Sequence, residues 1–291
     1  MRKIDAIELG ATLFIPATHK DLQVVVEGRK YPNLKSVLVD CEDSVSDDTI
    51  QIALKSIRQL LLNFQKGTCL VFIRPRNIKI LKEILLFEGI ENIDGFILPK
   101  FSLSNAREYI KTLESKYLFM PSIEGIELFN NTKLLELQEI LLKHQEQIIT
   151  IRFGLEDMLR QLKMRRKCED SIFDFSVTSS VLGNFIATFK NVGFNISGGV
   201  FPCFKDSKGF KKDVLRDLKE GLFSKTIIHP NQIEITNLLY RVSKIEFEEA
   251  LSISKSEQQL FPQNDKMVEV TTMSPWANDI IKRAEVYGLV D

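Results

Sequence analysis

The sequence has no long hydrophobic run and no excess of charge of either sign. Its 291 residues include 39 Lys and Arg and 39 Asp and Glu, so the formal net charge is zero. A chain specialised for nucleic acid normally carries a basic excess, so we expect no nucleic-acid partner. No apolar stretch approaches the roughly 20 residues that a membrane helix needs, so we expect no membrane association.

Cysteine and histidine are scarce. The four cysteines are scattered without a C-x-x-C pair, and there are only three histidines, so no structural zinc site is expected. Basic residues at the N-terminus are followed at once by Asp5, with no apolar segment typical of a secretory signal. These features favour a reduced, cytoplasmic setting.

The glycine-rich phosphate-binding motifs G-x-G-x-x-G and G-x-x-x-x-G-K-[ST] are also absent. Instead, eight short apolar segments recur, as expected for parallel strands buried on both faces. We predict strands at Ala11–Pro16, Ser36–Asp40, Cys69–Arg74, Gly95–Pro99, Tyr117–Ile123, Ile148–Gly154, Asn195–Phe201 and Lys225–His229.

Longer segments with helical periodicity separate these strands. We predict helices at Asp48–Phe64, Asn105–Leu113, Leu128–Leu142, Val177–Asn191 and Leu215–Gly221. Eight alternations match an α/β protein of the (β/α)8 TIM-barrel type, which typically has about 250 residues. A doubly wound open sheet is the competing arrangement.

The predicted barrel covers residues 1–240, and residues 241–291 form a C-terminal helical extension. No strand is expected in the extension. We predict helices at Ile245–Ile253 and Pro275–Tyr287, on either side of the polar stretch Ser254–Lys266. The extension is expected to pack on the barrel or on a neighbouring subunit.

Charged residues follow the carboxyl ends of the predicted strands, where the active site of such a barrel lies. Glu124 and Asp157 follow neighbouring strands, and carboxylate oxygens with water suit Mg²⁺. Arg74 can offer a planar fork to a substrate carboxylate. Mg²⁺ beside this arginine would chelate a 2-oxo acid and stabilise an enolate. Alternatively, the two carboxylates cap helices or pair with Arg74 and Arg152.

At these residues the chain resembles the citrate lyase β-subunit/HpcH–HpaI aldolase superfamily. Seven segments carry the resemblance, in family order over residues 11 to about 255. They are Leu13–Pro16, Val39–Val45, Phe72–Arg74, Asp94–Lys100, Pro121–Glu124, Phe153–Met158 and Ile228–Ile233.

A narrower likeness is to citrate-lyase-like carbon–carbon bond lyases associated with tellurium-resistance-type stress operons. It is carried by Ala11–Thr18, Leu162–Arg166, Lys225–Pro230 and the closing Trp276-Ala277, Arg283-Ala284 and Tyr287-Gly288. Members of that branch are linked with ATP-grasp enzymes and phosphoribosyltransferases, so the resemblance implies such pathway partners and a stress response.

The resemblance implies Mg²⁺, or alternatively Mn²⁺, held by Glu124 and Asp157. It implies Arg74, Glu42 and Asp43 as catalytic residues, with Arg74 also binding a substrate carboxylate or carbonyl oxygen. Glu124 would contact the substrate as well. It also implies a homo-oligomer, either a trimer or a hexamer.

For each of three further side chains, the sequence allows two interpretations. Arg76 binds an additional anionic group of the substrate, or it is a solvated surface charge. His229 acts as a general base, or it shapes the loop after the last strand. Lys100 forms a Schiff base, or it has an electrostatic or structural role.

Two departures from the superfamily matter. Many members have Pro-Gly and then a substrate-binding arginine after the first strand, whereas this chain has Pro16-Ala17-Thr18-His19-Lys20. His19 or Lys20 would then take the place of that arginine. No motif for coenzyme A could be matched, so a CoA thioester, a free acid and a sugar-derived aldol are all candidate substrates.

The resulting hypothesis is a Mg²⁺-dependent carbon–carbon lyase or aldolase. It would act on a 2-oxo acid or acyl substrate through a metal-stabilised enolate. One alternative is a malyl-CoA-type thioester hydrolase that uses the same site. Another is a non-catalytic barrel that serves as a scaffold in a stress-linked biosynthetic complex.

Overall fold

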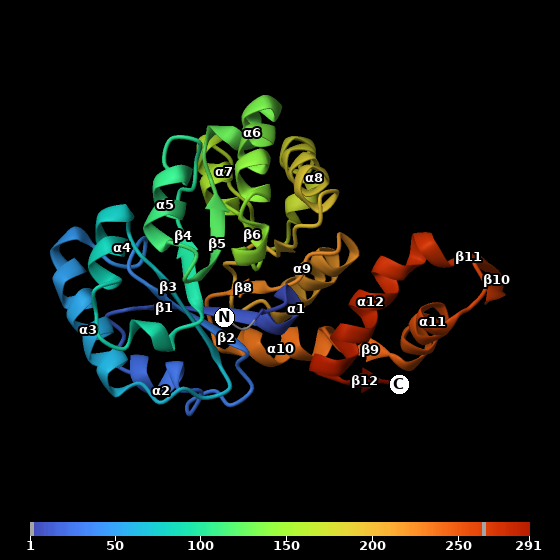
Figure 1. Ribbon diagram of the computed structural model, residues 1–291, viewed down its shortest axis with the longest axis horizontal. Helices are drawn as coiled ribbons and strands as arrows, with labels where there is room; N and C mark the ends of the chain where they lie inside the picture. Colours follow the sequence, from blue (N-terminus) through green and yellow to red (C-terminus); the bar gives the residue numbers. More distant parts are fainter. Residues whose placement is uncertain (1–2, 264–265) are drawn as a thin grey trace. The chain divides into compact units, whose positions relative to one another are not determined.

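Eight parallel strands close into a barrel in the computed structural model, which describes residues 3–263 and 266–291. The strands are β1 (Ala11–Pro16), β2 (Ser36–Asp40), β3 (Leu70–Arg74), β4 (Gly95–Leu98), β5 (Leu118–Ile123), β6 (Ile151–Phe153), β7 (Ile196–Ser197) and β8 (Lys225–Ile227). Their order is β7-β6-β5-β4-β3-β2-β1-β8, and an isolated parallel bridge between Gly198 and Lys225 joins the two ends. The TIM barrel is confirmed (Figure 1).

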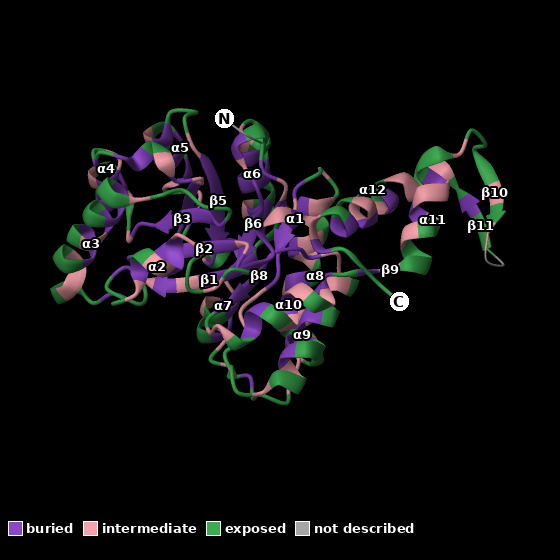
Figure 2. Ribbon diagram, turned by 90° about the horizontal axis from the view of Figure 1, so that it is seen from below, coloured by how far each residue is buried: buried purple, intermediate pink, exposed green. Residues whose placement is uncertain are grey.

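Helices surround these strands, and Figure 2 shows that the strands are buried while most of the helices have a buried and an exposed side. They are α1 (Ala6–Leu9), α2 (Leu22–Val26), α3 (Ile50–Asn63), α4 (Ile78–Ile84), α5 (Ala106–Leu113), α6 (Asn131–Leu142), α7 (Leu155–Gln161), α8 (Ser176–Lys190) and α9 (Ser207–Lys219). The next helix, α10 (Asn231–Leu239), contains the boundary between the two compact units of the chain. Short 3₁₀ helices are η1 (Asp47–Thr49), η2 (Ile90–Asn92), η3 (Ile126–Phe129), η4 (Gln145–Gln147) and η5 (Ile172–Asp174). The five helices predicted between strands are present, whereas α2, α4 and α7 were missed because they are too short to show periodicity.

Polar side chains begin several of these helices. The side chain of Asn77 accepts a hydrogen bond from the backbone N–H of Ile80 at the start of α4. Asn130 does the same at α6, and Asp206 at α9. Such caps satisfy N–H groups that have no partner inside the helix, so they fix where each loop ends and each helix begins.

The same strands supply both the apolar core and the charged end of the barrel. Leu38, Phe72 and Met120 belong to one buried cluster on β2, β3 and β5. Side chains two residues apart on a strand share a face, so Asp40 and Arg74 follow the core residues on that face. Phe14 of β1 packs against the cluster.

The C-terminal unit, Glu234–Asp291, has its own core. It contains α11 (Lys244–Lys255), α12 (Val270–Tyr287), β9 (Val242–Ser243), β10 (Leu260–Gln263), β11 (Lys266–Glu269) and β12 (Leu289–Val290). Both predicted helices are present. The expectation of no strand was wrong: β10 pairs with β11, and β12 with β9, in segments too short for a recognisable alternation.

Cys168 and Cys203 form a disulfide between the segment after α7 and the segment after β7. The expectation of reduced cysteines was wrong for this pair, because the two residues are 35 positions apart and no spacing motif marks them in the sequence. The other two cysteines, Cys41 and Cys69, are free and buried, and burial raises the pKa of each thiol to about 12.

In the described parts of the chain, no helix combines the length and the apolar character that crossing a membrane requires.

Candidate active site

A pocket of about 180 Å³ lies at the carboxyl ends of the barrel strands. Four of the residues predicted from the sequence line it: Asp43, Arg74, Glu124 and Asp157. They follow or end β2, β3, β5 and β6, so the fold brings together side chains that are far apart in the sequence. This is the face on which TIM barrels carry their chemistry.

Arg74 is buried among three carboxylates. Its Nε and Nη2 donate to the two oxygens of Asp40 at 2.6 and 3.0 Å, and its Nη1 lies 2.9 Å from Oε2 of Glu42. Asp43 is 3.4 Å from Nη2. Burial alone would raise the pKa of Asp40, but the hydrogen bonds and charge of Arg74, together with hydrogen bonds from Ser44 and Glu42, outweigh it and lower that pKa. The planar fork of Arg74 is therefore engaged within the protein.

Asp40 is a site residue that the sequence reasoning missed. Besides holding Arg74, its Oδ1 accepts the backbone N–H of Glu42 at 3.0 Å, and its Oδ2 accepts the N–H of Ser44 at 3.1 Å. It therefore shapes the loop that carries Glu42 and Asp43. The available signal was its place at the head of the acidic run after β2, directly across from Arg74 in the strand register.

Glu42 bridges two cations. Its Oε1 lies 2.7 Å from Nζ of Lys100, and its Oε2 contacts Arg74. Burial raises the pKa of Glu42, although both cations oppose the effect. The hydrogen bond to Glu42 raises the pKa of Lys100, which keeps its amine protonated and argues against a Schiff base. Lys100 also has a left-handed backbone with φ of 47°, a conformation that non-glycine residues rarely adopt.

Glu124 presents a buried oxygen without a partner. Its Oε2 forms no hydrogen bond with any described residue, and the residue is only 6% exposed. Burial, followed by the charges of Glu42 and Asp157, raises the pKa of Glu124 to about 7, against a hydrogen bond from Ser122. The raised pKa and the unpartnered oxygen show that no described cation pairs with Glu124 to stabilise its charged form.

The β6–α7 turn is shaped around Glu124. A Cβ on Gly154 would lie 2.4 Å from Cγ of Glu124, so only glycine fits there. Asp157 follows in the first turn of α7, and its Oδ1 accepts a hydrogen bond from Arg160 at 2.7 Å. Glycine therefore lets the two carboxylates approach the same pocket.

These two carboxylates fit a hard divalent cation. No group of three or more His, Cys, Asp or Glu side chains in the described chain is arranged to hold a metal. A cation between Glu124 and Asp157 would then take two protein ligands and water, which suits Mg²⁺ because it retains several waters.

The structural alternative for this pair has less support. Within residues 3–263 and 266–291, neither Glu124 nor Asp157 forms an ion pair with Arg74 or Arg152, and no side chain caps α7. Arg160, the partner of Asp157, is largely exposed. A surface pair of this kind contributes little to stability.

Two predicted residues have other surroundings. Arg76 is not among the described residues lining the pocket: it bonds Asp47 and the backbone oxygen of Val45 in the loop after β2. His229 stacks on Phe204 with ring centres 4.5 Å apart, and its Nδ1 accepts the backbone N–H of Asn231. These contacts favour the loop-shaping role of His229.

Arg152 lines the pocket but was considered from the sequence only as an ion-pair partner. It belongs to β6 and is 4% exposed. Its Nη2 donates to the hydroxyl of Thr226, and its guanidinium carbon lies 5.3 Å from the ring centre of Phe14. Burial and the charge of Arg74 lower its pKa to about 9. A lone arginine inside an otherwise apolar strand was the signal in the sequence.

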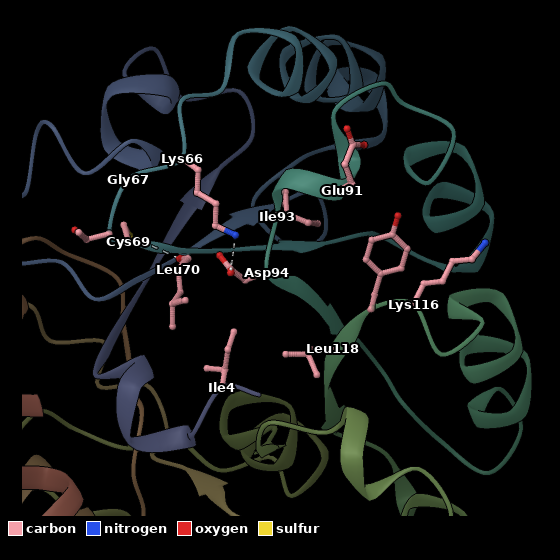
Figure 3. Close-up of a pocket in the computed structure, with 12 residues that line it drawn as sticks. Ile4, Lys66, Gly67, Cys69, Leu70, Glu91, Ile93, Asp94, Lys116 and Leu118 are labelled. Atoms are coloured by element: carbon pink, nitrogen blue, oxygen red, sulfur yellow. Dashed lines mark hydrogen bonds and ion pairs between the residues drawn. The ribbon is translucent and has the colours of Figure 1, made fainter. Parts of the chain in front are cut away.

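A larger pocket, of about 760 Å³, lies at the opposite ends of the strands (Figure 3). Residues preceding or beginning β3, β4 and β5 line it, including Leu70 and Leu118. Lys66 and Asp94 there pair at 2.9 Å, and Asp94 also accepts the backbone N–H of Val71. The larger volume of this pocket does not make it the active site, because residues at this end of a TIM barrel contribute to stability rather than to catalysis.

The fold and the carboxylate-lined pocket define the class, a TIM-barrel protein with an enzyme-like site. Residues 3–289 match the family described as C–C bond lyase of the TIM-barrel fold, and the chain belongs to that family.

Sequence relatives include (3S)-malyl-CoA thioesterases of Cereibacter sphaeroides. One, from strain ATCC 17025, is 23% identical over 73% of this chain and 71% of its own length. Another, from strain ATCC 17029, is 30% identical over 95 residues, so the match spans 33% of this chain and only 32% of that relative.

Two solved structures share the fold over nearly the whole chain. A citrate lyase from Burkholderia xenovorans LB400 has a TM-score of 0.76 at 16% identity, covering 99% of this chain and 94% of that one. The protein CitE from Mycobacterium tuberculosis, in complex with magnesium, acetoacetate and coenzyme A, has a TM-score of 0.71 at 18% identity. That match covers 96% and 99% of the two chains.

Proposed function

We propose that this protein is a Mg²⁺-dependent carbon–carbon bond lyase or aldolase acting on a 2-oxo acid or acyl substrate. The observation that carries the proposal is the buried, unpartnered Oε2 of Glu124 in the same pocket as Asp157. Membership of the C–C bond lyase family supports the reaction type. Mn²⁺ is an alternative ion for the same oxygen ligands.

Different residues of the pocket would bind the cation, contact the substrate and transfer the proton. Glu124 and Asp157 hold the cation, and Glu124 also faces the substrate. When bound, Mg²⁺ supplies Lewis-acid charge beside the oxygen on which negative charge develops. Arg74, fixed by Asp40, would contact the carbonyl oxygen of the substrate at the same pocket. Glu42 is a candidate to hold the transferred proton, because burial raises its pKa, and Asp43 is the other acidic candidate.

The ligands of the similar structures support a small acid as substrate. CitE from M. tuberculosis is described with magnesium and acetoacetate, and a citrate lyase β-subunit from the same organism with oxaloacetate and magnesium. The latter has a TM-score of 0.61 at 17% identity, so the likeness concerns the fold. We extend only the chemical class, a small carboxylate with a neighbouring carbonyl, to this protein.

A second candidate is hydrolysis of a CoA thioester at the same site, which the malyl-CoA thioesterase relatives favour. Product analysis with malyl-CoA separates the two reactions. A hydrolase releases malate and free CoA, whereas a lyase cleaves the malyl carbon–carbon bond and leaves an acyl-CoA.

The remaining sequence-based hypotheses belong to this proposal. They are a homotrimer or homohexamer, a cytoplasmic setting, and a place in a stress-operon branch with ATP-grasp or phosphoribosyltransferase partners. The non-catalytic scaffold is the least supported hypothesis, because a scaffold does not need a buried carboxylate without a partner.

Calorimetric titration tests the proposal. Wild type is titrated with Mg²⁺ or Mn²⁺, alone and with pyruvate or oxalate, beside Glu124→Gln and Asp157→Asn. We expect metal-dependent binding of the acid in wild type and its loss in both variants. Glu108→Gln is the control, because Glu108 pairs with Lys82 on an exposed surface. Unchanged metal binding in both site variants would contradict the proposal.

A further inference from the structure

Arg152 is a buried cation that forms no ion pair with a carboxylate of the described residues. It contributes a wall of the active-site pocket, its Nη1 is shielded from solvent, and that atom donates to no described residue. Its one hydrogen-bond partner, the hydroxyl of Thr226, is neutral. The guanidinium stays charged at neutral pH even with its lowered pKa of about 9. A charge held this way is costly unless something else compensates it.

Other buried cations of the barrel are compensated. Lys225 lies 2.5 Å from Asp213 and 2.6 Å from Asp217. Arg166 also pairs with Asp213, at 3.1 Å. The contrast sets Arg152 apart, because its contacts among the described residues are a hydroxyl and an aromatic ring, and Glu124 acts on it only as a more distant charge.

Arg74 and Arg152 lie near the same ring. Their guanidinium carbons are 5.2 and 5.3 Å from the centre of Phe14. The fork of Arg74 is taken by Asp40, with Glu42 and Asp43 close by, so Arg74 carries excess negative charge around it. Of the two arginines, Arg74 forms ion pairs, whereas Arg152 forms none with the residues that the structure describes.

We propose that Arg152 binds a carboxylate group of the substrate and is a specificity-determining residue of this pocket. The inference shares the pocket of the proposed function but does not require the metal. A small acid entering the pocket would supply the missing counter-charge, and planar carboxylates match the guanidinium fork. Phe14 and Thr226 keep that guanidinium in place.

The experiment measures carboxylate binding with the metal removed. Wild type, Arg152→Gln and Arg152→Lys are titrated calorimetrically with malonate and with pyruvate in EDTA, and again in Mg²⁺. Arg58→Gln is the matched control, since Arg58 also lies over a ring, that of Phe87 at 4.6 Å, but is exposed on α3 outside the pocket. Inorganic phosphate is titrated in parallel to distinguish a carboxylate site from a phosphate site.

We expect malonate to bind metal-free wild type and Arg58→Gln equally. Arg152→Gln should bind at least about tenfold more weakly, as expected when a charged hydrogen bond is lost. Arg152→Lys should lie between them. The melting temperature of ligand-free Arg152→Gln should equal or exceed that of wild type, because an uncompensated charge has been removed.

Equal malonate affinity in wild type and Arg152→Gln would overturn the inference, as would a clearly lowered melting temperature of the ligand-free variant. Tighter binding of phosphate than of malonate would overturn the carboxylate assignment, and so would the absence of acid binding under both conditions. A different result would contradict the proposed function alone. In that case the acid would still bind in EDTA and its binding would depend on Arg152, but Mg²⁺ would not bind. If instead Mg²⁺ promotes acid binding equally in Arg152→Gln, the inference fails and the proposed function stands.

Discussion

Two charged clusters in the barrel are equally buried but differently balanced. Near the closure between β7 and β8, Lys225 lies between two aspartates, and Arg166 pairs with one of them. In the pocket at the carboxyl ends, Oε2 of Glu124 and Nη1 of Arg152 have no hydrogen-bond partner among the residues that the structure describes, and Glu124 acts on Arg152 only as a more distant charge. The charges of the first cluster are paired within the chain, whereas the second holds an anion and a cation that are not paired.

The difference distinguishes structural charges from charges held for a ligand. Buried ion pairs are tolerated when their partners are in place, and breaking one leaves an uncompensated charge. Charges left without partners in the folded chain are costly until a ligand supplies the partner. A cation at Glu124 and an acid at Arg152 would complete the second cluster as Asp213 and Asp217 complete the first.

The largest effect is expected at the complete cluster. Lys225→Met removes the cation between Asp213 and Asp217 and leaves only Arg166, which pairs with Asp213, so it should lower the free energy of unfolding by about 3–5 kcal/mol. Urea denaturation measures this free energy. Arg152→Met is the comparison variant, and its free energy of unfolding should fall little or should rise. Equal losses in the two variants would remove the distinction between the clusters.

The pH dependence of the free energy of unfolding should show the titration of the Glu124 carboxyl group. Its pKa in the folded state, about 7, exceeds the ordinary glutamate value, so the folded chain binds the proton more tightly than the unfolded chain. Stability should therefore fall as the pH rises from about 4.5 to 7, by about 2 kcal/mol. Burial also raises the pKa of Asp217, to about 6, which adds a change of the same sign.

The contribution of Glu124 is isolated by comparing wild type with Glu124→Gln in EDTA across this pH range. Wild type should lose stability relative to the variant as the pH rises, and saturating Mg²⁺ should restore the loss in wild type only. Parallel curves for the two proteins would show that Glu124 does not titrate here.

Gly154→Ala tests how closely the turn is fitted to Glu124. The added Cβ would displace the side chain of Glu124, so Mg²⁺ affinity should fall by at least about tenfold, or about 1.4 kcal/mol. Calorimetry measures the affinity. Gly183→Ala is the control, because a Cβ there meets no atom within 4 Å. Similar Mg²⁺ affinities in the two variants would argue against Glu124 as a ligand.

The smallest effect is expected at Arg76. Its partner Asp47 is 93% exposed, so Arg76→Gln should change stability by at most about 1 kcal/mol. If Arg76 only holds the loop, the affinity for pyruvate should stay unchanged. A marked loss of acid binding with stability retained would instead support the sequence-based hypothesis that Arg76 binds an anionic group.

The sequence was most informative where burial is continuous. All residues of β2, β3 and β5 are buried, which is why their apolar runs marked the barrel strands correctly. Glu124, Glu42 and Asp43 were singled out because they follow β5 and β2, and Asp157 because it follows β6. The short strands of the C-terminal unit had no such pattern.

The features that the sequence did not predict are contacts between residues of different strands and loops of the barrel. The fork of Arg74 goes to Asp40 because the strand register places them side by side. The lack of a carboxylate at Arg152 and the contact of Cys168 with Cys203 are likewise properties of the closed structure. Sequence proximity carries no information on such long-range partners.

The most direct measurement is a crystal structure of the protein grown with Mg²⁺ and pyruvate. We predict an octahedral ion about 2.0–2.1 Å from carboxylate oxygens of Glu124 and Asp157, completed by water or the acid. We also predict the pyruvate carboxylate within hydrogen-bonding distance of Arg152. An ion held elsewhere, or a pyruvate whose carboxylate avoids Arg152 and is bound by Arg74 alone, would contradict the account.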